Sequence, residues 1–263
     1  MISNSKVSAS QYKKLSDLVY KESGIVLNEK KFELLTARLA KRMRVTKISS
    51  ISEYIRFMNN DENELISFID TITTNHTFFF RENSHCEFIV KTLDKNKALK
   101  IWCAASSSGE EPYSIAIQLA TNSFKFDIFA SDLSGTVLKS GENAVYPNER
   151  VQSVPLPLLH KYFQKGKGQY KDHVKVKHEI KKHVSFEKHN LLSDSPFSKQ
   201  EKFDIIFCRN VMIYFDNNTR EKVVHNLLRS LKSGGYLFVG LSESLQGLQH
   251  GLTTVLPSGY IKN

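Results

Sequence analysis

The sequence predicts an α/β protein in which a small helical domain precedes a parallel sheet with crossover helices. Residues 1–82 carry apolar side chains at helical spacing, and no strand-like alternation interrupts them. From residue 99 onward, short apolar runs alternate with helix-like segments, which is typical of parallel sheets. The chain has 263 residues, of which 40% are hydrophobic and 24% charged. This composition is ordinary for a globular protein and excludes a wholly disordered chain.

The helical part begins with two segments whose apolar positions predict helices over residues 10–22 and 30–44, the first ending near Gly24. Ser50 and Asn60 are residue types that cap helices, and acidic residues follow each of them in the first turn. Two further helices are therefore expected. We predict a helical domain with its linker over residues 1–82 and a second domain over residues 83–263.

In the second domain, apolar runs predict strands over residues 99–104, 126–131, 203–208 and 236–241. Helices are expected over residues 110–120 and 219–231. The closing segment 252–261, with a Pro-Ser-Gly turn at its centre, predicts a β-hairpin. Between residues 155 and 188 the alternation lapses, and lysines and β-forming residues become frequent. This stretch predicts an antiparallel insertion.

Lysine and arginine number 37 and aspartate and glutamate 27, which gives a net charge of +10. Such a charge favours an anionic partner, whether nucleic acid, a membrane surface or an acidic protein. The three cysteines (Cys86, Cys103 and Cys208) contain no CxxC pair, so no disulfide framework is expected. The polar start lacks the apolar core of a signal peptide, and no apolar stretch reaches the roughly 20 residues of a membrane helix. We expect a soluble cytoplasmic protein without membrane insertion.

The turn Ser106–Gly109 lies between a predicted strand and a predicted helix, where a ligand can approach the backbone. Asp132 follows at about the spacing of roughly 20 residues expected for a ribose-binding carboxylate. A full GxGxxG pattern is absent, and Glu110 and Glu111 would repel a pyrophosphate. A ligand with an ammonium or sulfonium group, such as S-adenosylmethionine, fits better than a dinucleotide. The alternative, that the two glutamates only complement the helix dipole, stays open.

Four segments, 74–82, 101–114, 203–216 and 235–244, resemble the chemotaxis receptor methyltransferases of the CheR family. They stand in the family's order and cover nearly the whole chain. The resemblance implies methylation of glutamate side chains on the cytoplasmic domain of chemoreceptors, with S-adenosylmethionine as cofactor and S-adenosylhomocysteine as product. It also implies a helical N-terminal domain, a Rossmann-like catalytic domain and an inserted antiparallel β-subdomain at about residues 155–188.

The resemblance further implies which residues contact the cofactor. These are Asn75, Thr77, Arg81, Glu110, Glu111, Asp132, Asn190, Leu191, Arg209 and Asn210. In the family, one glutamate of the pair lies beside the methionine part of the cofactor, and the aspartate binds the ribose. The segment 190–191 corresponds to the adenine site, and the segment 209–210 to the site of the reacting methyl group. Arg81 and Tyr214 are expected to position the reactants.

A basic helix of the N-terminal domain carries Arg38, Lys41, Arg42 and Arg44. The resemblance implies that it docks on the acidic methylation region of the receptor, and the alternative is a solvated helix face. Leu241 stands where the family usually has histidine. Four histidines lie within residues 161–190, but no cysteine accompanies them, so no metal site is expected.

The expected chemistry makes few demands on side chains. A glutamate carboxylate is already nucleophilic at neutral pH, so positioning and desolvation supply most of the catalysis and no base is expected. One alternative is a nucleic-acid methyltransferase, but Val211 and Met212 follow Asn210 where such enzymes carry Pro-Pro. Cytosine-type methylation with Cys208 as nucleophile is also disfavoured, because no proline precedes Cys208. The other alternative, a non-catalytic receptor-binding module, is disfavoured because the residues that match the cofactor site are all present.

Overall fold

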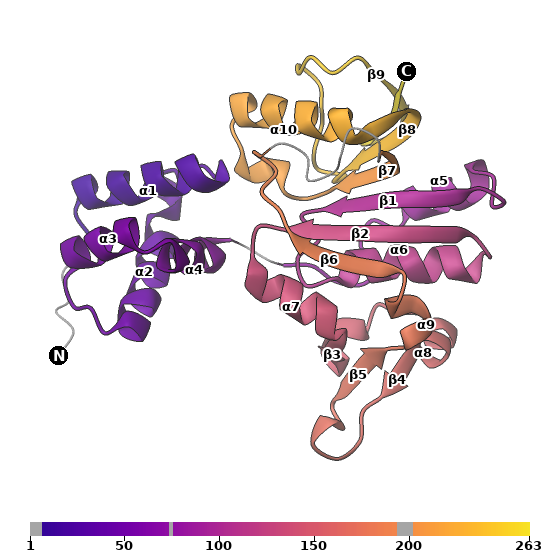
Figure 1. Cartoon of the computed structure of the whole chain (residues 1–263), viewed down its shortest axis with the longest axis horizontal. Coiled ribbons are helices and arrows are strands. Elements are labelled where there is room, and N and C mark those ends of the chain that lie inside the picture. Colours follow the sequence, from indigo (N-terminus) through magenta and orange to yellow (C-terminus); the bar gives the residue numbers. More distant parts are fainter. Residues whose placement is uncertain (1–6, 74–75, 194–201) are drawn as a thin grey trace. The chain divides into compact units, whose positions relative to one another are not determined.

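The computed structural model describes residues 7–73, 76–193 and 202–263, and the chain divides into two compact units (Figure 1). Unit 1 comprises residues 1–74 and 214–219, and unit 2 comprises residues 75–213 and 220–263. Unit 1 is helical, and unit 2 combines a mixed sheet with helices and a small antiparallel sheet. The predicted fold class is therefore confirmed.

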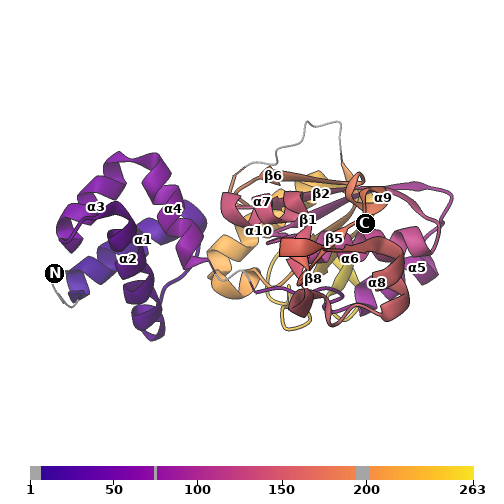
Figure 2. The same ribbon diagram turned by 90° about the horizontal axis from the view of Figure 1, so that it is seen from below.

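Unit 1 contains the helices α1 (Ala9–Ser23), α2 (Phe32–Thr46), α3 (Ile51–Asn60) and α4 (Glu62–Ile72), with a short 3-10 helix, η1 (Glu29–Lys31), before α2 (Figure 2). Ser8 and Ser50 cap α1 and α3, since each side chain accepts a hydrogen bond from a first-turn amide. Asp61 caps α4 by accepting from the Glu64 amide at 3.1 Å. The predicted cap, Asn60, is instead the last residue of α3.

The core of unit 1 consists of apolar side chains at the spacing that predicted the helices. Leu15, Leu35, Leu39, Tyr54 and Phe68 are fully or almost fully buried there. Residues 214–219 also belong to this unit, although they are distant from it in sequence. The amide of residue 26 donates to the carbonyl of residue 214 at 2.9 Å, and residues 25 and 215 form a β-bridge.

The main sheet of unit 2 has the strand order β6-β2-β1-β7-β8-β10-β9. Its strands are β1 (Ala98–Ala104), β2 (Lys125–Asp132), β6 (Val184–Lys188), β7 (Phe203–Cys208), β8 (Leu231–Val239), β9 (Leu252–Leu256) and β10 (Gly259–Lys262). The first five strands in this order pair in parallel, and β10 pairs antiparallel to β8 and β9. Strands β1 and β7 are almost continuously buried, as parallel strands covered on both faces are.

The remaining helices of the described chain are α5 (Ser84–Thr92), α6 (Glu110–Thr121), α7 (Gly135–Asn143), α8 (Leu156–Tyr162), α9 (His178–Lys181) and α10 (Asn217–Ser230), with short 3-10 turns η2 (Asn148–Val151), η3 (Gly168–Tyr170) and η4 (Met212–Tyr214). They belong to unit 2, except that the end of η4 and the start of α10 fall within residues 214–219 of unit 1. Helix α6 packs on β2, and α7 packs on β6 and β2. The predicted order of strand, turn and helix is thus present: β1 precedes the turn at residues 105–109, and α6 follows it.

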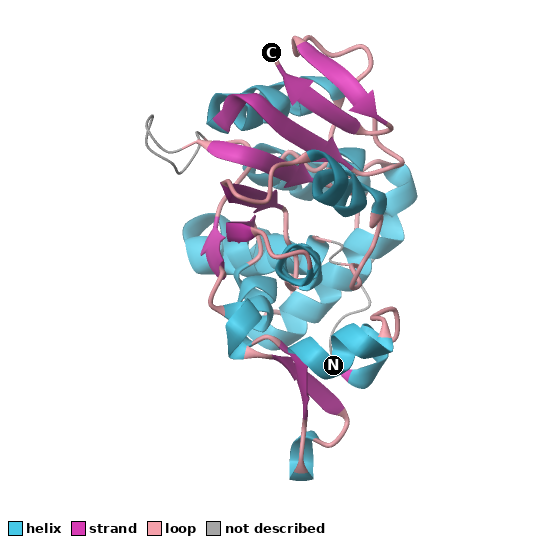
Figure 3. Cartoon of the chain, turned by 90° about the vertical axis from the view of Figure 1, so that its right-hand side faces the viewer, coloured by secondary structure: helices cyan, strands magenta, loops and turns pink. Residues whose placement is uncertain are grey.

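A small antiparallel sheet lies apart from the main sheet and has the order β3-β5-β4 (Figure 3). Its strands are β3 (Val145–Pro147), β4 (Phe163–Lys165) and β5 (His173–Val176). The predicted insertion at residues 155–188 is correct in type, but its limits differ. The small sheet includes β3, which lies before residue 155. Residues 184–188, at the end of the predicted insertion, instead form β6, which pairs with β2 in the main sheet.

Residues 76–82, which the sequence prediction grouped with the helical domain as its linker, are assigned to unit 2. Phe79 of this segment is fully buried in the core of that unit. The Phe79 ring meets the rings of Tyr146 and Phe163 edge to face, with centroids 5.0 and 5.4 Å away. Its carbonyl accepts a hydrogen bond from the Ser153 hydroxyl at 2.8 Å.

Within the three described stretches of the chain, we find no helix that combines the length and the apolar character needed to cross a membrane.

Candidate functional site

The carboxyl ends of the parallel strands of unit 2 bring most of the predicted site residues to one edge of the sheet. The register aligns Ala104 of β1 with Ser131 of β2, and Cys103 of β1 with Phe207 of β7. The segments that follow these strands, residues 105–109, 132–134 and 209–210, therefore start at the same edge. In open α/β sheets, ligands bind in the crevice outside this edge.

The turn after β1 has an unusual backbone that Gly109 makes possible. Ala105, Ser107 and Gly109 all have positive φ, and that of Gly109 is 92°. A side chain at Gly109 would be strained at this angle, and its Cβ would lie 2.9 Å from the Tyr146 hydroxyl and 3.0 Å from the Gly141 Cα. The turn is thus held tightly against the elements beside it, and it leads directly into the amino end of α6.

Asp132 ends β2 and fastens this turn. Its carboxylate is buried, and Oδ2 accepts from the Ser107 amide at 2.9 Å while Oδ1 accepts from the Ser134 amide at 3.0 Å. Its own carbonyl accepts from the His189 amide at 3.0 Å. The carboxylate therefore lies between the turn after β1 and the start of α7, and the segment after β6 runs beside it.

Glu110, the first residue of α6, is almost completely buried and already has partners on both oxygens. Ser108 Oγ donates to Oε2 at 2.6 Å, and Arg150 Nη1 donates to Oε1 at 3.2 Å. Burial raises the pKa of Glu110, and the Ser108 hydroxyl and Arg150 oppose that rise. Arg150 also donates to the carbonyl of Thr77 at 2.9 Å, which holds the predicted residue Thr77 against this region.

Glu111, the next residue, has only one of its oxygens engaged. Arg209 Nε donates to Oε2 at 2.7 Å, while Oε1 is buried without a hydrogen-bond partner among the described residues. The Arg209 side chain is 3% exposed, and it also donates to the carbonyls of Arg81 and Glu82 at 3.1 and 3.0 Å. Burial disfavours its charge, but the neighbouring groups, Glu111 above all, outweigh burial and raise the pKa of Arg209.

A buried polar atom without a partner costs free energy unless a ligand or water satisfies it. Glu111 Oε1 is one such atom, and Ser106 Oγ in the turn after β1 is another. A buried carboxylate oxygen with no partner suits a cationic ligand group. The acceptor oxygens at this edge thus fit a ligand with an ammonium group, and Glu111, unlike Glu110, has an oxygen to offer it.

Asn210 follows Arg209 and is fixed by two carboxylates that the sequence prediction did not assign. Its amide donates to Glu243 Oε2 at 2.8 Å, and its side-chain Nδ2 donates to Glu82 Oε1 at 3.1 Å. Glu82 and Glu243 lie within segments that carried the family resemblance, so the signal was present without a role attached. Arg150 lies outside those segments, and nothing in the sequence pattern singles it out.

The other predicted residues are placed as follows. Asn190 Oδ1 accepts from the Leu192 amide at 3.0 Å, and the Leu191 carbonyl accepts from Asn226 at 3.0 Å, so both lie in the segment that follows β6. Arg81 is partly exposed, and its guanidinium lies over the Phe78 ring, 5.6 Å from the centroid. Asn75 lies outside the described residues. Tyr214 belongs to unit 1, where Lys31 Nζ lies 5.0 Å from its ring centroid.

The cysteines are buried, as expected for Cys103 and Cys208. Burial raises the pKa of Cys208 and of Cys103 well above the usual value, and that of Cys86 to about 12. A thiolate is therefore disfavoured at each position, which argues against Cys208 as a nucleophile.

The predicted docking residues of α2 have different environments in unit 1. Lys41 and Arg44 are exposed and Arg38 is partly exposed. Arg42 instead points to Glu64, with Nε and Nη2 bonded to the two carboxylate oxygens at 3.0 and 2.5 Å. Tyr54 donates to the same carboxylate at 2.6 Å. Arg42 thus belongs to an internal network, and we remove it from the docking surface.

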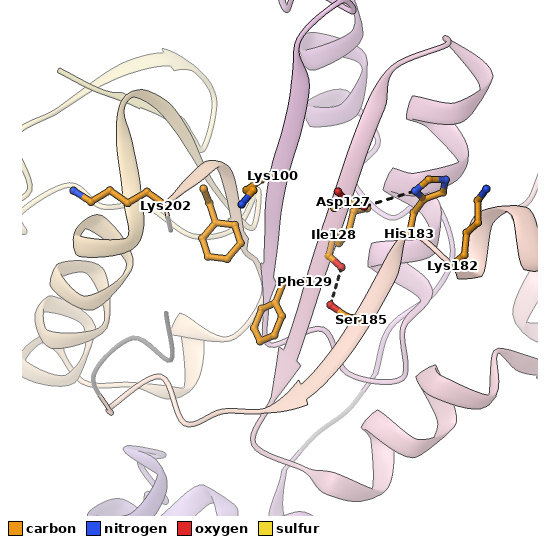
Figure 4. Close-up of a pocket in the computed structure, with 9 residues that line it drawn as sticks. Lys100, Asp127, Ile128, Phe129, Lys182, His183, Ser185 and Lys202 are labelled. Carbon is orange, nitrogen blue, oxygen red and sulfur yellow. Dashed lines mark hydrogen bonds and ion pairs between the residues drawn. The ribbon is translucent and has the colours of Figure 1, made fainter. Parts of the chain in front are cut away.

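A separate cavity of about 350 Å³ opens beside the first halves of β1, β2 and β6 (Figure 4). It is lined by Lys100, Asp127, Ile128, Phe129, Lys182, His183, Ser185, Lys202 and Phe203. None of the predicted site residues that the structure describes lines it.

Known protein families and proteins match both units of the chain. The sequence model described as "CheR methyltransferase, SAM binding domain" matches residues 75–259, and the one described as "CheR methyltransferase, all-alpha domain" matches residues 10–73. A chemotaxis protein methyltransferase of Borreliella burgdorferi is 38% identical over 99% of this chain and 96% of its own length. Chemotaxis protein methyltransferase 2 of Pseudomonas aeruginosa is 36% identical over 93% and 90%, and the Escherichia coli enzyme 34% identical over 94% and 88%.

Proposed function

The chain is a member of the CheR methyltransferase family, and we propose that it transfers the methyl group of S-adenosylmethionine to glutamate side chains of membrane chemoreceptors in the cytoplasm. Its class as a methyltransferase of chemotaxis and its S-adenosylmethionine-binding domain come with the family. The acceptor and the receptor are the proposed part. The observation that carries it is that relatives named chemotaxis protein methyltransferase match nearly the whole chain, including the basic helical unit.

The residues present fit S-adenosylmethionine. We assign the ammonium group to Glu111 rather than Glu110, because Glu111 Oε1 is buried and has no partner among the residues that the structure describes, whereas both oxygens of Glu110 are bonded. Asp132, beside the turn after β1, would bind the ribose hydroxyls. When bound, the cofactor supplies an activated methyl group on a positively charged sulfur.

The side chains around this edge support a carboxylate acceptor. Glu82 and Glu243 accept backbone and side-chain amide hydrogen bonds, and Glu110 accepts hydrogen bonds from Ser108 and Arg150. These carboxylates therefore hold structure in place and are not positioned as bases that would remove a proton from an acceptor. A glutamate is ionised at neutral pH and needs no residue to remove a proton before it attacks. The chain therefore has to orient the two reactants and exclude water, and Arg209 contributes by tying Glu111 to the backbone of residues 81 and 82.

The acceptor can be tested with methyl-labelled S-adenosylmethionine and a membrane fraction that contains chemoreceptors. We expect label on receptor-sized protein, released as methanol by mild base, which identifies a carboxyl methyl ester. The Glu111→Ala variant serves as the control and should transfer little label. Label in nucleic acid, or base-stable label on protein, would contradict the proposal.

A further prediction concerns the docking surface, defined as Arg38, Lys41 and Arg44 on α2. If it meets an acidic receptor surface, changing all three to alanine should slow receptor methylation several-fold at low salt and flatten its dependence on ionic strength. Affinity for S-adenosylmethionine and the melting temperature should stay the same, because these side chains are partly or fully exposed.

Arg42→Ala is the matched control on the same helix. It removes the cation that pairs with the Glu64 carboxylate, to which the Tyr54 hydroxyl also donates, so the melting temperature should fall. A triple variant that methylates receptors at the normal rate in low salt would remove the docking surface from the proposal.

A further inference from the structure

Asn210 has a backbone conformation that needs support. Its φ is 58°, in the left-handed region, which asparagine tolerates better than other non-glycine residues but at a cost. It is the second residue after β7, at the edge of the sheet where the candidate site lies. Three separate features of unit 2 hold it in this state.

The backbone of Asn210 is held by Glu243. This side chain is buried, and its Oε2 accepts from the amides of Asn210 at 2.8 Å and Gly240 at 2.6 Å. Its Oε1 accepts from the Ile213 amide at 3.2 Å. One carboxylate thus fastens the turn after β7 to the turn after β8.

The side-chain amide of Asn210 is held by Glu82. Glu82 Oε1 accepts from Asn210 Nδ2 at 3.1 Å, and Oε2 accepts from the Leu241 amide at 3.0 Å. Arg81 and Arg209 guanidinium nitrogens lie 3.9 Å from its oxygens, so Glu82 has positive charge around it. An ionised carboxylate only accepts hydrogen bonds, so the nitrogen end of the Asn210 amide must face it. The oxygen Oδ1 therefore faces the other way.

The space for this amide depends on Gly240. A Cβ at position 240 would lie 2.5 Å from Asn210 Nδ2, so no larger residue fits while the amide keeps its place. Two carboxylates and a glycine thus fix one asparagine: Glu82 comes from one segment, and Glu243 and Gly240 from the turn after β8. Arg209, its neighbour, links the same group to Glu111, whose Oε1 is buried and finds no partner in the described part of the chain.

We propose that Glu82 and Glu243 are positioning residues that present Asn210 Oδ1 as a hydrogen-bond acceptor to the cationic methionine part of S-adenosylmethionine. Glu82 sets the direction of the amide and Glu243 sets the backbone that carries it. Together with the free oxygen of Glu111, Oδ1 gives this edge of the sheet two acceptors for one positively charged ligand segment. The inference depends on the cofactor alone, so it stands or falls independently of the proposed glutamate acceptor.

The test compares two ligands by calorimetry on the full chain: S-adenosylmethionine, and 5′-methylthioadenosine, which has the same nucleoside but lacks both the amino acid part and the positive charge on sulfur. Glu82→Gln and Asn210→Ala should each weaken binding of S-adenosylmethionine by about five- to tenfold, the effect of one lost hydrogen bond. Neither change should alter affinity for 5′-methylthioadenosine. Glu87→Gln removes an exposed charge from nearby α5 without contacting Asn210, and it should have no effect.

The double variant Glu82→Gln/Asn210→Ala separates positioning from simple charge. If Glu82 acts through Asn210, the double variant binds S-adenosylmethionine no more weakly than Asn210→Ala alone. Additive losses, or equal losses for the two ligands, would overturn the proposal. If Glu82→Gln does not fold, Asn210→Ala alone decides, because only a contact with the methionine part, which 5′-methylthioadenosine lacks, makes its effect specific to S-adenosylmethionine.

Discussion

The Arg209→Met variant should be less stable than the natural protein by about 3–5 kcal/mol in the free energy of unfolding, measured without cofactor. The guanidinium is nearly fully buried and provides the cation for Glu111, whose side chain is 12% exposed. Removing the cation leaves a buried carboxylate uncompensated, which costs far more than the net gain from the pair. The carbonyls of residues 81 and 82 lose their donor at the same time.

Two variants make this expectation specific. Lys232→Met breaks an ion pair with Asp204 that is as short, 2.7 Å, but has side chains 43% and 28% exposed, and it should cost at most about 1 kcal/mol. Arg209→Met/Glu111→Leu removes both buried charges and should recover part of the lost stability. A single Arg209 variant as stable as the Lys232 variant would show that the buried pair does not support the site.

The elements of the catalytic unit could be predicted because their burial leaves a strong trace in the sequence. Strands β1 and β7 lie inside the parallel sheet, so each is mostly apolar in sequence, with Lys100 and Asp204 as the charged residues, and the predicted limits differ little from the observed ones. The limits of the antiparallel sheet were harder to predict from the sequence. Strand β3 has three residues, too few for a periodic pattern, and β6 follows the insertion without a change in composition.

The candidate site was predicted at the level of its segments but not of its contacts. Glu110 and Glu111 are adjacent in the first turn of α6, and nothing local distinguishes them. Their partners do, and these are Arg150 and Arg209, distant in sequence and brought close only by the fold. Likewise, a basic helix face does not reveal that Arg42 reaches a buried glutamate on another helix.

The second large effect is expected at Asp132. If its carboxylate binds the ribose hydroxyls, Asp132→Ala should weaken cofactor binding by roughly ten- to a hundredfold, since a hydrogen bond to a charged group contributes about 1.5–3 kcal/mol. The structure adds a second reason for a loss, because the same carboxylate holds the amides of Ser107 and Ser134. A loss of affinity alone therefore does not distinguish ribose binding from damage to the turn.

A change in the ligand separates the two effects of Asp132. The natural protein should bind S-adenosylhomocysteine more tightly than its 2′-deoxy counterpart, because the deoxy sugar lacks a hydroxyl that the carboxylate accepts from. In Asp132→Ala that difference should disappear, whereas damage to the turn would weaken both ligands and preserve their ratio. Calorimetry with the two ligands on the two proteins gives the four affinities. An unchanged ratio would show that Asp132 only fastens the turn, and the ribose would then have to be assigned to another residue at this edge of the sheet.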